Sequence, residues 1–259
     1  MGELDGRVAV VTGGGRGIGR GISELLAASG AIVAVNYRRD KAAADETVAA
    51  IERAGSAARA YQASVDDPGQ DAAMVDAVVA DLGPISILVN NGGVASRGQS
   101  VADTDPAEMT RVVATHALGP HHLCRLALPS MRTCARGDIV MVSSVATRNY
   151  GGNGAPYNMG KAALEALAFT LAKEERPNNI HVNVVAPGLV DTDMGVRLAR
   201  AMRRDRDLDI RSLDASSPFG RVCQPLDVAR VVMWLCTEGA GYVTGQRIEC
   251  DGGGALMTY

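Results

Sequence analysis

Aromatic side chains are scarce in this sequence. Phe, Trp and Tyr make up 3% of its 259 residues, whereas apolar residues as a whole reach 47%. The core must therefore be built mainly from small aliphatic side chains such as Ala, Val and Leu. A core of this kind is typical of helices that pack closely on a β-sheet.

Cysteine is sparse as well, and its spacing excludes the common cysteine-based frameworks. The 5 cysteines lie far apart, their number is odd and no CxxC motif occurs. This pattern argues against a disulfide scaffold and against a zinc site. We therefore expect no metal and a reduced, cytoplasmic compartment.

The chain has neither an excess of basic residues nor a long apolar run. Its 26 Lys and Arg residues stand against 29 Asp and Glu residues. Such a balance argues against nucleic acid as a partner. The first apolar run, Val8–Val11, is too short for a signal peptide, and no stretch is long enough to span a bilayer, so we expect no membrane association.

Short apolar runs alternate with longer helical patterns along the chain. The expected strands are Val8–Val11, Ile32–Val35, Ala58–Gln62, Ile85–Val89, Ile139–Val142, Val182–Val185 and Arg247–Glu249. The expected helices are Ile18–Ser29, Ala42–Arg53, Pro68–Leu82, Pro106–Met131, Pro156–Arg176 and Pro225–Leu235. This alternation predicts one α/β domain over residues 1–259, with a doubly wound parallel sheet of about seven strands and helices on both faces. The irregular, polar stretch 189–219 is a candidate lid over a binding site.

A glycine-rich loop lies between the first strand and the first helix. It reads Thr12-Gly13-Gly14-Gly15-Arg16-Gly17-Ile18-Gly19. Glycines let the backbone approach a pyrophosphate, and the helix N-terminus supplies N–H groups and positive partial charge. A tight turn would use the same residues, but the position between strand and helix favours dinucleotide binding.

Further motifs follow in a consistent order. They are Asn90-Asn91-Gly92-Gly93, Ser144, Tyr157-x-x-x-Lys161, Pro187-Gly188 with Thr192, Tyr242-Val243-Thr244-Gly245-Gln246 and Asp251-Gly252-Gly253. With the glycine loop, they resemble the short-chain dehydrogenase/reductase family over essentially the whole chain, and 3-oxoacyl-[acyl-carrier-protein] reductases most of all. The resemblance implies a single-domain Rossmann fold and an NAD(P)-dependent oxidoreductase.

The same resemblance implies a set of cofactor-binding residues. They are Gly13, Arg16, Gly17, Ile18, Gly19, Tyr37, Arg38, Ser64, Val65, Asn91, Gly92, Gly93, Tyr157, Lys161, Pro187, Gly188, Val190 and Thr192.

The end of the second strand indicates which nicotinamide cofactor is preferred. NAD sites place an acid there for the ribose 2′-hydroxyl, and NADP sites place an arginine for the 2′-phosphate. This chain has Tyr37 followed by Arg38, with Arg16 in the glycine loop. We therefore expect NADP(H) to be preferred over NAD(H), although both arginines could also be solvated loop charges. Ser64 replaces the acid that relatives use to bind adenine, and a hydroxyl accepts a hydrogen bond more weakly.

The expected catalytic residues are Ser144, Tyr157 and Lys161. Tyr157 and Lys161 are four residues apart, so they share one helix face. Ser144 follows a strand, at the sheet edge where ligands bind in such folds. By resemblance, Tyr157 is the general acid/base and Ser144 donates a hydrogen bond to the substrate oxygen. Lys161 lowers the pKa of Tyr157 and binds the nicotinamide ribose.

Two roles remain to be assigned by the resemblance. Thr192 would hold the carboxamide of the nicotinamide. His116 replaces an asparagine that in relatives helps to hold a water linked to the lysine, largely through its backbone carbonyl. His116 could titrate near neutral pH and take part directly, or it could be a packed, backbone-bonded histidine.

These features predict an NADPH-dependent enzyme that reduces a ketone to a secondary alcohol. Candidate substrates are a 3-oxoacyl thioester and a polyketide-type ketone, and the arginines Arg197, Arg200, Arg203 and Arg204 could receive the phosphate of a thioester carrier. Alternatives are an alcohol or sugar dehydrogenase working oxidatively, and a catalytically weak nucleotide-binding regulator. Relatives lead us to expect a homotetramer or homodimer.

Overall fold

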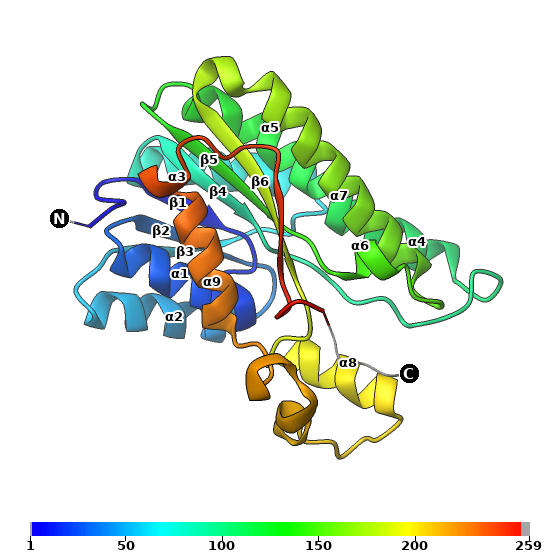
Figure 1. Cartoon of the computed structure of the whole chain (residues 1–259). Helices are drawn as coiled ribbons and strands as arrows, with labels where there is room; N and C mark the ends of the chain where they lie inside the picture. Colours follow the sequence, from blue (N-terminus) through cyan, green and yellow to red (C-terminus); the bar gives the residue numbers. More distant parts are fainter. Residues whose placement is uncertain (1, 255–259) are drawn as a thin grey trace.

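A seven-stranded sheet, all parallel, forms the centre of the molecule, with strand order β3-β2-β1-β4-β5-β6-β7 (Figure 1). The computed structural model describes residues 2–254. The strands are β1 Val8–Val11, β2 Ile32–Tyr37, β3 Ala58–Gln62, β4 Ile85–Asn90, β5 Gly137–Val142, β6 Ile180–Pro187 and β7 Arg247–Cys250. The predicted doubly wound parallel sheet is confirmed.

Helices cover both faces of this sheet. They are α1 Gly17–Ala28, α2 Lys41–Arg53, α3 Pro68–Leu82, α4 Pro106–Val113, α5 Gly119–Met131, α6 Ala146–Asn149, α7 Ala155–Glu174, α8 Asp193–Arg203 and α9 Pro225–Leu235. Successive side chains of a strand point to opposite faces. Ile139 therefore packs in the core formed with α3, α5 and α7, whereas Val140 packs in the core formed with α1, α2 and α9.

Local sequence signals explain where several helices begin and end. The carboxylates of Asp40, Asp67 and Asp105 accept hydrogen bonds from N–H groups in the first turns of α2, α3 and α4. These contacts satisfy N–H groups that have no partner within the helix. After α2 and α3 the chain turns at Gly55 and Gly83, which have φ values of 85° and 98°. Both glycines occupy a conformation that disfavours other residues.

The single helix predicted over Pro106–Met131 is interrupted. Residues Ala114–Leu118 form a π-helical turn between α4 and α5, where the N–H of Gly119 donates to the carbonyl of Ala114. Pro120 has no N–H, so it cannot donate to the carbonyl of His116 four residues earlier. The proline thus favours a wider turn at His116, and such turns are frequent at functional sites.

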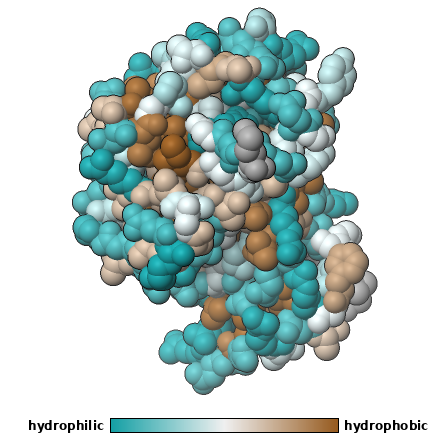
Figure 2. Space-filling view, turned by 90° about the vertical axis from the view of Figure 1, so that its left-hand side faces the viewer, coloured by the Kyte–Doolittle hydropathy of each residue, from teal (hydrophilic) through white to brown (hydrophobic). Residues whose placement is uncertain are grey.

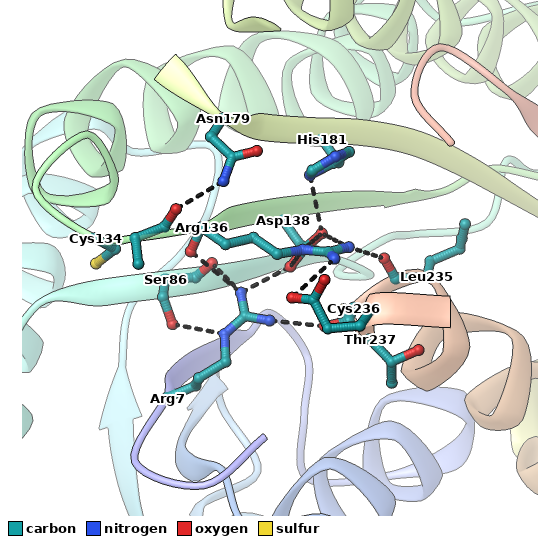
Figure 3. Close-up of polar contacts among 12 residues, drawn as sticks. Arg7, Ser86, Cys134, Arg136, Asp138, Asn179, His181, Leu235, Cys236 and Thr237 are labelled. Carbon is teal, nitrogen blue, oxygen red and sulfur yellow. Dashed lines mark hydrogen bonds and ion pairs between the residues drawn. The ribbon is translucent and has the colours of Figure 1, made fainter. Parts of the chain in front are cut away.

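A buried ion network ties the strands together at their amino ends (Figure 3). Asp138, on β5, is only 1% exposed. Its carboxylate lies 2.7 Å from Nη2 of Arg7 and 2.9 Å from Nη2 of Arg136. Arg7 also donates to the carbonyl of Cys236, at 2.7 Å. The network therefore joins β5 to the start of β1 and the end of α9.

Residues 189–219 are more regular than their sequence predicted. They contain α8 and two 3₁₀ segments, Ile210–Ser216 and Pro218–Gly220. Ala199, Ile210 and Val222 form a small hydrophobic cluster there, separate from the two that cover the sheet. We call residues 189–222 the lid, after the role predicted for residues 189–219, which stays a prediction. In both views it projects at the bottom of the molecule, and its surface is largely hydrophilic with some hydrophobic side chains (Figure 1, Figure 2).

None of the helices within residues 2–254 is long and apolar enough to cross a membrane.

Candidate active site

The glycine loop is held against the second strand by one buried asparagine. Oδ1 of Asn36 accepts from the N–H of Gly13 at 3.2 Å, and the Asn36 carbonyl accepts from the N–H of Gly14 at 2.9 Å. Nδ2 of Asn36 donates to the carbonyl of Ala63, beyond β3. Sequence reasoning assigned Asn36 no role. The signal that could have found it is a polar residue at the end of an otherwise apolar strand.

The start of α1 has the free N–H groups that a pyrophosphate requires. Its N-cap residue, Arg16, makes no capping hydrogen bond, whereas side chains cap α2, α3, α4 and α8. Gly13 and Gly17 adopt left-handed φ values of 60° and 53°. The first-turn N–H groups are thus available to an anion, and this part of the chain fits a dinucleotide.

Gly17, at the start of α1, lies in direct contact with Thr192. A Cβ atom on Gly17 would lie 3.2 Å from Cγ2 of Thr192. Both residues line an open groove of about 780 Å³ between α1, the start of α8 and the start of α9. The Thr192 hydroxyl caps α8 by accepting from the N–H of Gly195 at 3.0 Å. The start of α8 therefore lies against the start of α1, although the two are far apart in the sequence.

The segment after β4 packs directly on the glycine loop. Oγ1 of Thr12 accepts from the N–H groups of Asn91 and Gly92, at 2.9 and 2.7 Å. The Asn91 side chain donates to the carbonyl of Thr12 at 2.9 Å. A Cβ atom on Gly93 would lie 2.7 Å from Cε1 of His116. The glycine loop, the segment after β4 and His116 therefore lie together.

The remaining predicted backbone positions line the same edge of the sheet. A Cβ on Gly19 would lie 2.1 Å from the carbonyl oxygen of Gly13, so only glycine fits there. The N–H of Gly188, directly after Pro187, donates to the carbonyl of Cys250 at 3.1 Å. Val190 forms an isolated parallel bridge with Cys223 and leads to Thr192. Ile18 and Val65 are partly buried against the two main clusters.

The predicted phosphate clamp lies at the exposed connection from β2 to α2. Tyr37 is the last residue of β2, and Arg38 follows it as an exposed side chain. Nη1 of Arg16 lies 3.8 Å from the carboxylate of Asp40, two residues beyond Arg38. Arg16 and Arg38 therefore both lie at this connection. The Arg16–Asp40 contact is an exposed ion pair, which contributes little and can be displaced.

Ser64 has a partner that sequence reasoning did not assign. Its hydroxyl donates to Oδ1 of Asp66, and its N–H donates to Oε1 of Gln70 at 2.9 Å. The serine that replaces the usual acid thus has a carboxylate beside it, two residues along the chain.

Ser144, Tyr157 and Lys161 converge beyond the carboxyl end of β5. The Ser144 side chain lies close enough to the Tyr157 hydroxyl to lower its pKa. The buried ammonium of Lys161 donates to the carbonyl of Val142 at 2.6 Å and lies 5.8 Å from the centre of the Tyr157 ring. The structure therefore brings together the residues predicted to act on a substrate.

Burial shifts the pKa values of Lys161 and Tyr157. It lowers the pKa of Lys161 to about 8, and the charge of Glu165 only partly opposes this. Burial also raises the pKa of Tyr157, against the smaller, lowering effect of Ser144. The sequence had led us to expect a lowered pKa for Tyr157, but burial raises it instead, and the Lys161 ammonium, which donates to the carbonyl of Val142, does not offset this.

Glu165 binds the segments next to Ser144 and lies on the same helix as Lys161. Sequence reasoning did not assign it a role. Its Oε1 accepts from the hydroxyls of Ser143 and Thr147, at 2.5 and 2.7 Å, and from Nε of Arg247 at 3.1 Å. Glu165 lies four residues after Lys161, on the same helix face. That spacing is the signal that could have found it.

Comparison with known proteins agrees with this arrangement. The family model described as Enoyl-(Acyl carrier protein) reductase matches residues 13–255. The tetrahydroxynaphthalene reductase of Pyricularia oryzae is 36% identical over 260 residues, which cover 98% of this chain and 91% of that protein. The versicolorin reductase stcU of Emericella nidulans is 35% identical over 258 residues, covering 97% and 96%. The chain belongs to the short-chain dehydrogenase/reductase family.

A solved structure extends the likeness to three dimensions. The angucycline C-6 ketoreductase LanV, solved with bound NADP, superposes with a TM-score of 0.87 at 33% identity, covering 97% of this chain and 96% of that chain. This short-chain dehydrogenase/reductase is therefore an NAD(P)-dependent oxidoreductase with a Rossmann fold.

Within this short-chain dehydrogenase/reductase, His116 is held by the backbone. Its Nε2 lies 2.7 Å from the carbonyl oxygen of Val94, and its ring meets that of Tyr157 edge-on at 5.1 Å. Burial, with the charge of Lys161, lowers the pKa of His116 to about 3. The ring therefore stays neutral near pH 7 and does not titrate there.

Among residues 2–254, no three His, Cys, Asp or Glu side chains gather in a way that could hold a metal ion.

Proposed function

We propose that this protein uses NADPH to reduce a polyketide-type ketone to a secondary alcohol. The observation that carries the proposal is the convergence of Ser144, Tyr157 and Lys161 beside the open start of α1. The names of the relatives support the substrate class, because they are reductases of tetrahydroxynaphthalene and versicolorin and an angucycline ketoreductase.

The catalytic side chains have distinct roles in this proposal. The bound nicotinamide supplies the hydride. The Ser144 hydroxyl orients the ketone oxygen, and the Tyr157 hydroxyl delivers a proton to that oxygen as negative charge develops on it. Lys161, with a pKa of about 8, can replace the proton that Tyr157 gives up, and it would bind a ribose hydroxyl of the cofactor. Thr192, at the mouth of the lid, would orient the carboxamide.

The glycine loop and its neighbours would hold the rest of the cofactor. The N–H groups at the start of α1 would bind the pyrophosphate, with Gly13, Gly17, Ile18 and Gly19 in close approach. Asn91, Gly92 and Gly93 would line the wall after β4, and Pro187, Gly188 and Val190 would line the wall after β6. Ser64 and Val65 would lie against the adenine.

The preference for NADPH follows from charge at the end of β2. Tyr37 offers no carboxylate to a ribose 2′-hydroxyl, and the Arg16 and Arg38 guanidinium groups flank the connection where a 2′-phosphate would lie. Two guanidinium groups suit a phosphate because each can donate paired hydrogen bonds.

The lid offers apolar side chains that suit a ring-bearing substrate. Met194, Leu198 and Met202 repeat every four residues on α8 and are 38%, 51% and 52% exposed. Methionine adapts its shape and makes favourable contacts with aromatic rings.

We also propose that copies of the chain associate through α5 and α7, as a dimer or tetramer. Light scattering measures the mass of the assembly and so tests whether the chain associates.

The cofactor assignment is tested by titrating the purified protein with NADPH and NADH. We expect NADPH to bind at least ten times more tightly, and Arg38→Gln to remove most of this preference. Arg39→Gln is the matched control, since the adjacent residue is also an exposed arginine. Equal affinities in the wild type would refute the clamp. If NADPH supports no reduction of polyketide-type bicyclic ketones, the proposed reductase activity is refuted.

A further inference from the structure

We propose that Cys223 and Cys250 form an oxidative modification site, at which a hydroperoxide converts the two thiols into a disulfide bond. Cys223 directly follows the lid, and Cys250 is the last residue of β7, the edge strand of the sheet. The bond would therefore fasten the end of the lid to the sheet. The inference goes beyond the proposed reductase function and does not depend on it.

The fold brings the two cysteines to one short stretch of chain, although they are far apart in the sequence. The carbonyl of Cys250 accepts from the N–H of Gly188 at 3.1 Å. Cys223 forms the isolated bridge with Val190, and its carbonyl accepts from the N–H of Asp191 at 2.8 Å. The residues that join β6 to the lid therefore bind the backbones of both cysteines.

The Cys223 side chain reaches Cys250 within this arrangement. Its Sγ lies 4.0 Å from the carbonyl oxygen of Cys250. Each thiol is also the largest influence on the pKa of the other, which is lowered for Cys250 and raised for Cys223. Both side chains are partly buried against the core formed with α1, α2 and α9, so the protein holds them in place. Proximity fixed in this way is what a disulfide requires.

The remaining cysteines are less suited to oxidation. Cys124 and Cys236 are each 1% exposed, and burial raises the pKa of both thiols. A buried thiol that rarely ionises reacts slowly. Cys134 is partly buried, and its Sγ donates to two backbone carbonyls, at 3.6 and 3.7 Å. Cys223 and Cys250 are therefore the thiols that an oxidant would meet as a pair.

The chemistry proceeds in two steps that balance. The Cys250 thiolate attacks one oxygen of the hydroperoxide, so that an S–O bond forms, the O–O bond breaks and hydroxide or alkoxide leaves. The Cys223 sulfur then attacks the resulting sulfenic acid, so that the S–S bond forms and the oxygen leaves as water with the Cys223 proton. The two sulfurs together lose two electrons, which the hydroperoxide gains. Cys250 attacks first because its thiol has the lowered pKa.

The experiment treats the reduced, purified protein with hydrogen peroxide. We expect the intact mass to fall by about 2 Da as the two thiols lose their hydrogens, and peptide mapping to join Cys223 to Cys250. Tm should rise by roughly 5 °C because the bond closes a loop in the unfolded chain, and dithiothreitol should reverse both changes. Cys250→Ser should abolish them. Cys134→Ser, at another partly buried cysteine, is the matched control and should leave them unchanged.

Dimedone, which labels sulfenic acids, tests the order of the two steps. Cys223→Ser should accumulate the sulfenic acid at Cys250, and Cys250→Ser should take up about tenfold less label. Equal labelling of the two variants would overturn Cys250 as the attacking thiol. A gain of oxygen in place of the lost hydrogens, a bond between two chains, or a lower Tm after oxidation would overturn the disulfide site. Ketone reduction is assayed separately on the reduced protein, so either proposal can fail alone.

Discussion

The buried ammonium of Lys161 predicts a measurable coupling between pH and stability. Burial lowers its pKa from 10.5 to about 8. Because the pKa is lower in the folded state, the unfolded chain binds more protons between these values, and the stability of the fold rises with pH across that window. The difference of about 2.5 pKa units corresponds to a penalty of about 3 kcal/mol at neutral pH.

Replacing Lys161 with methionine removes the titrating group while keeping a similar volume. Urea unfolding at about pH 7 and pH 9.5 should show the wild type gaining about 2 kcal/mol relative to Lys161→Met between the two values. The hydrogen bond to Val142 is lost at both values, so its cost largely cancels. Lys173→Met, at an exposed position of α7, is the control and should show no such difference. Parallel profiles for wild type and Lys161→Met would refute a buried, charged lysine.

Further variants test other parts of the molecule. Tyr157→Phe should lower kcat by about 10²–10⁴-fold with little change in NADPH affinity, and nearly wild-type turnover would exclude Tyr157 as the proton donor. Asp138→Ala should cost about 3–5 kcal/mol, because it leaves Arg7 without a carboxylate partner and Arg136 with only the exposed Glu238, and should lower Tm by about 10 °C. Asp45→Ala, in an exposed pair, should change little. In His116→Asn the pH–rate profile between about pH 6 and pH 8 should keep its shape, because His116 is neutral throughout; a vanished inflection would contradict its lowered pKa.

The sheet could be predicted because a strand that is buried on both faces appears in the sequence as an unbroken run of apolar residues. Val8–Val11 is such a run, and its predicted bounds match the structure. β6 proved longer than predicted at both ends, because His181 interrupts the apolar pattern before Val182 and the strand continues through Ala186 and Pro187. Asn183 is accommodated by accepting from the N–H of Gln246 at 3.0 Å and donating to the carbonyl of Val243 at 2.9 Å. Partners so distant in sequence leave no local signal.

The predicted site was informative where chemistry depends on spacing. Tyr157 and Lys161 share a helix face, and Ser144 follows a strand, so their convergence could be expected. Asn36 and Glu165 were missed because their roles arise from contacts with residues far along the chain. The direction of the Tyr157 pKa was also beyond the sequence, since it depends on burial.

The hydrophobic cluster of the lid, formed by Ala199, Ile210 and Val222, shares no residue with the two clusters that cover the sheet. Apart from Val190, which packs in one of those two clusters, the lid therefore has a packing unit of its own, and we expect it to unfold locally before the sheet does. Its backbone amides should exchange with deuterium earlier than those of β5. The same independence lets substitutions accumulate on α8 at little cost to the rest of the fold, so substrate preference can diverge while the cofactor-binding framework is retained.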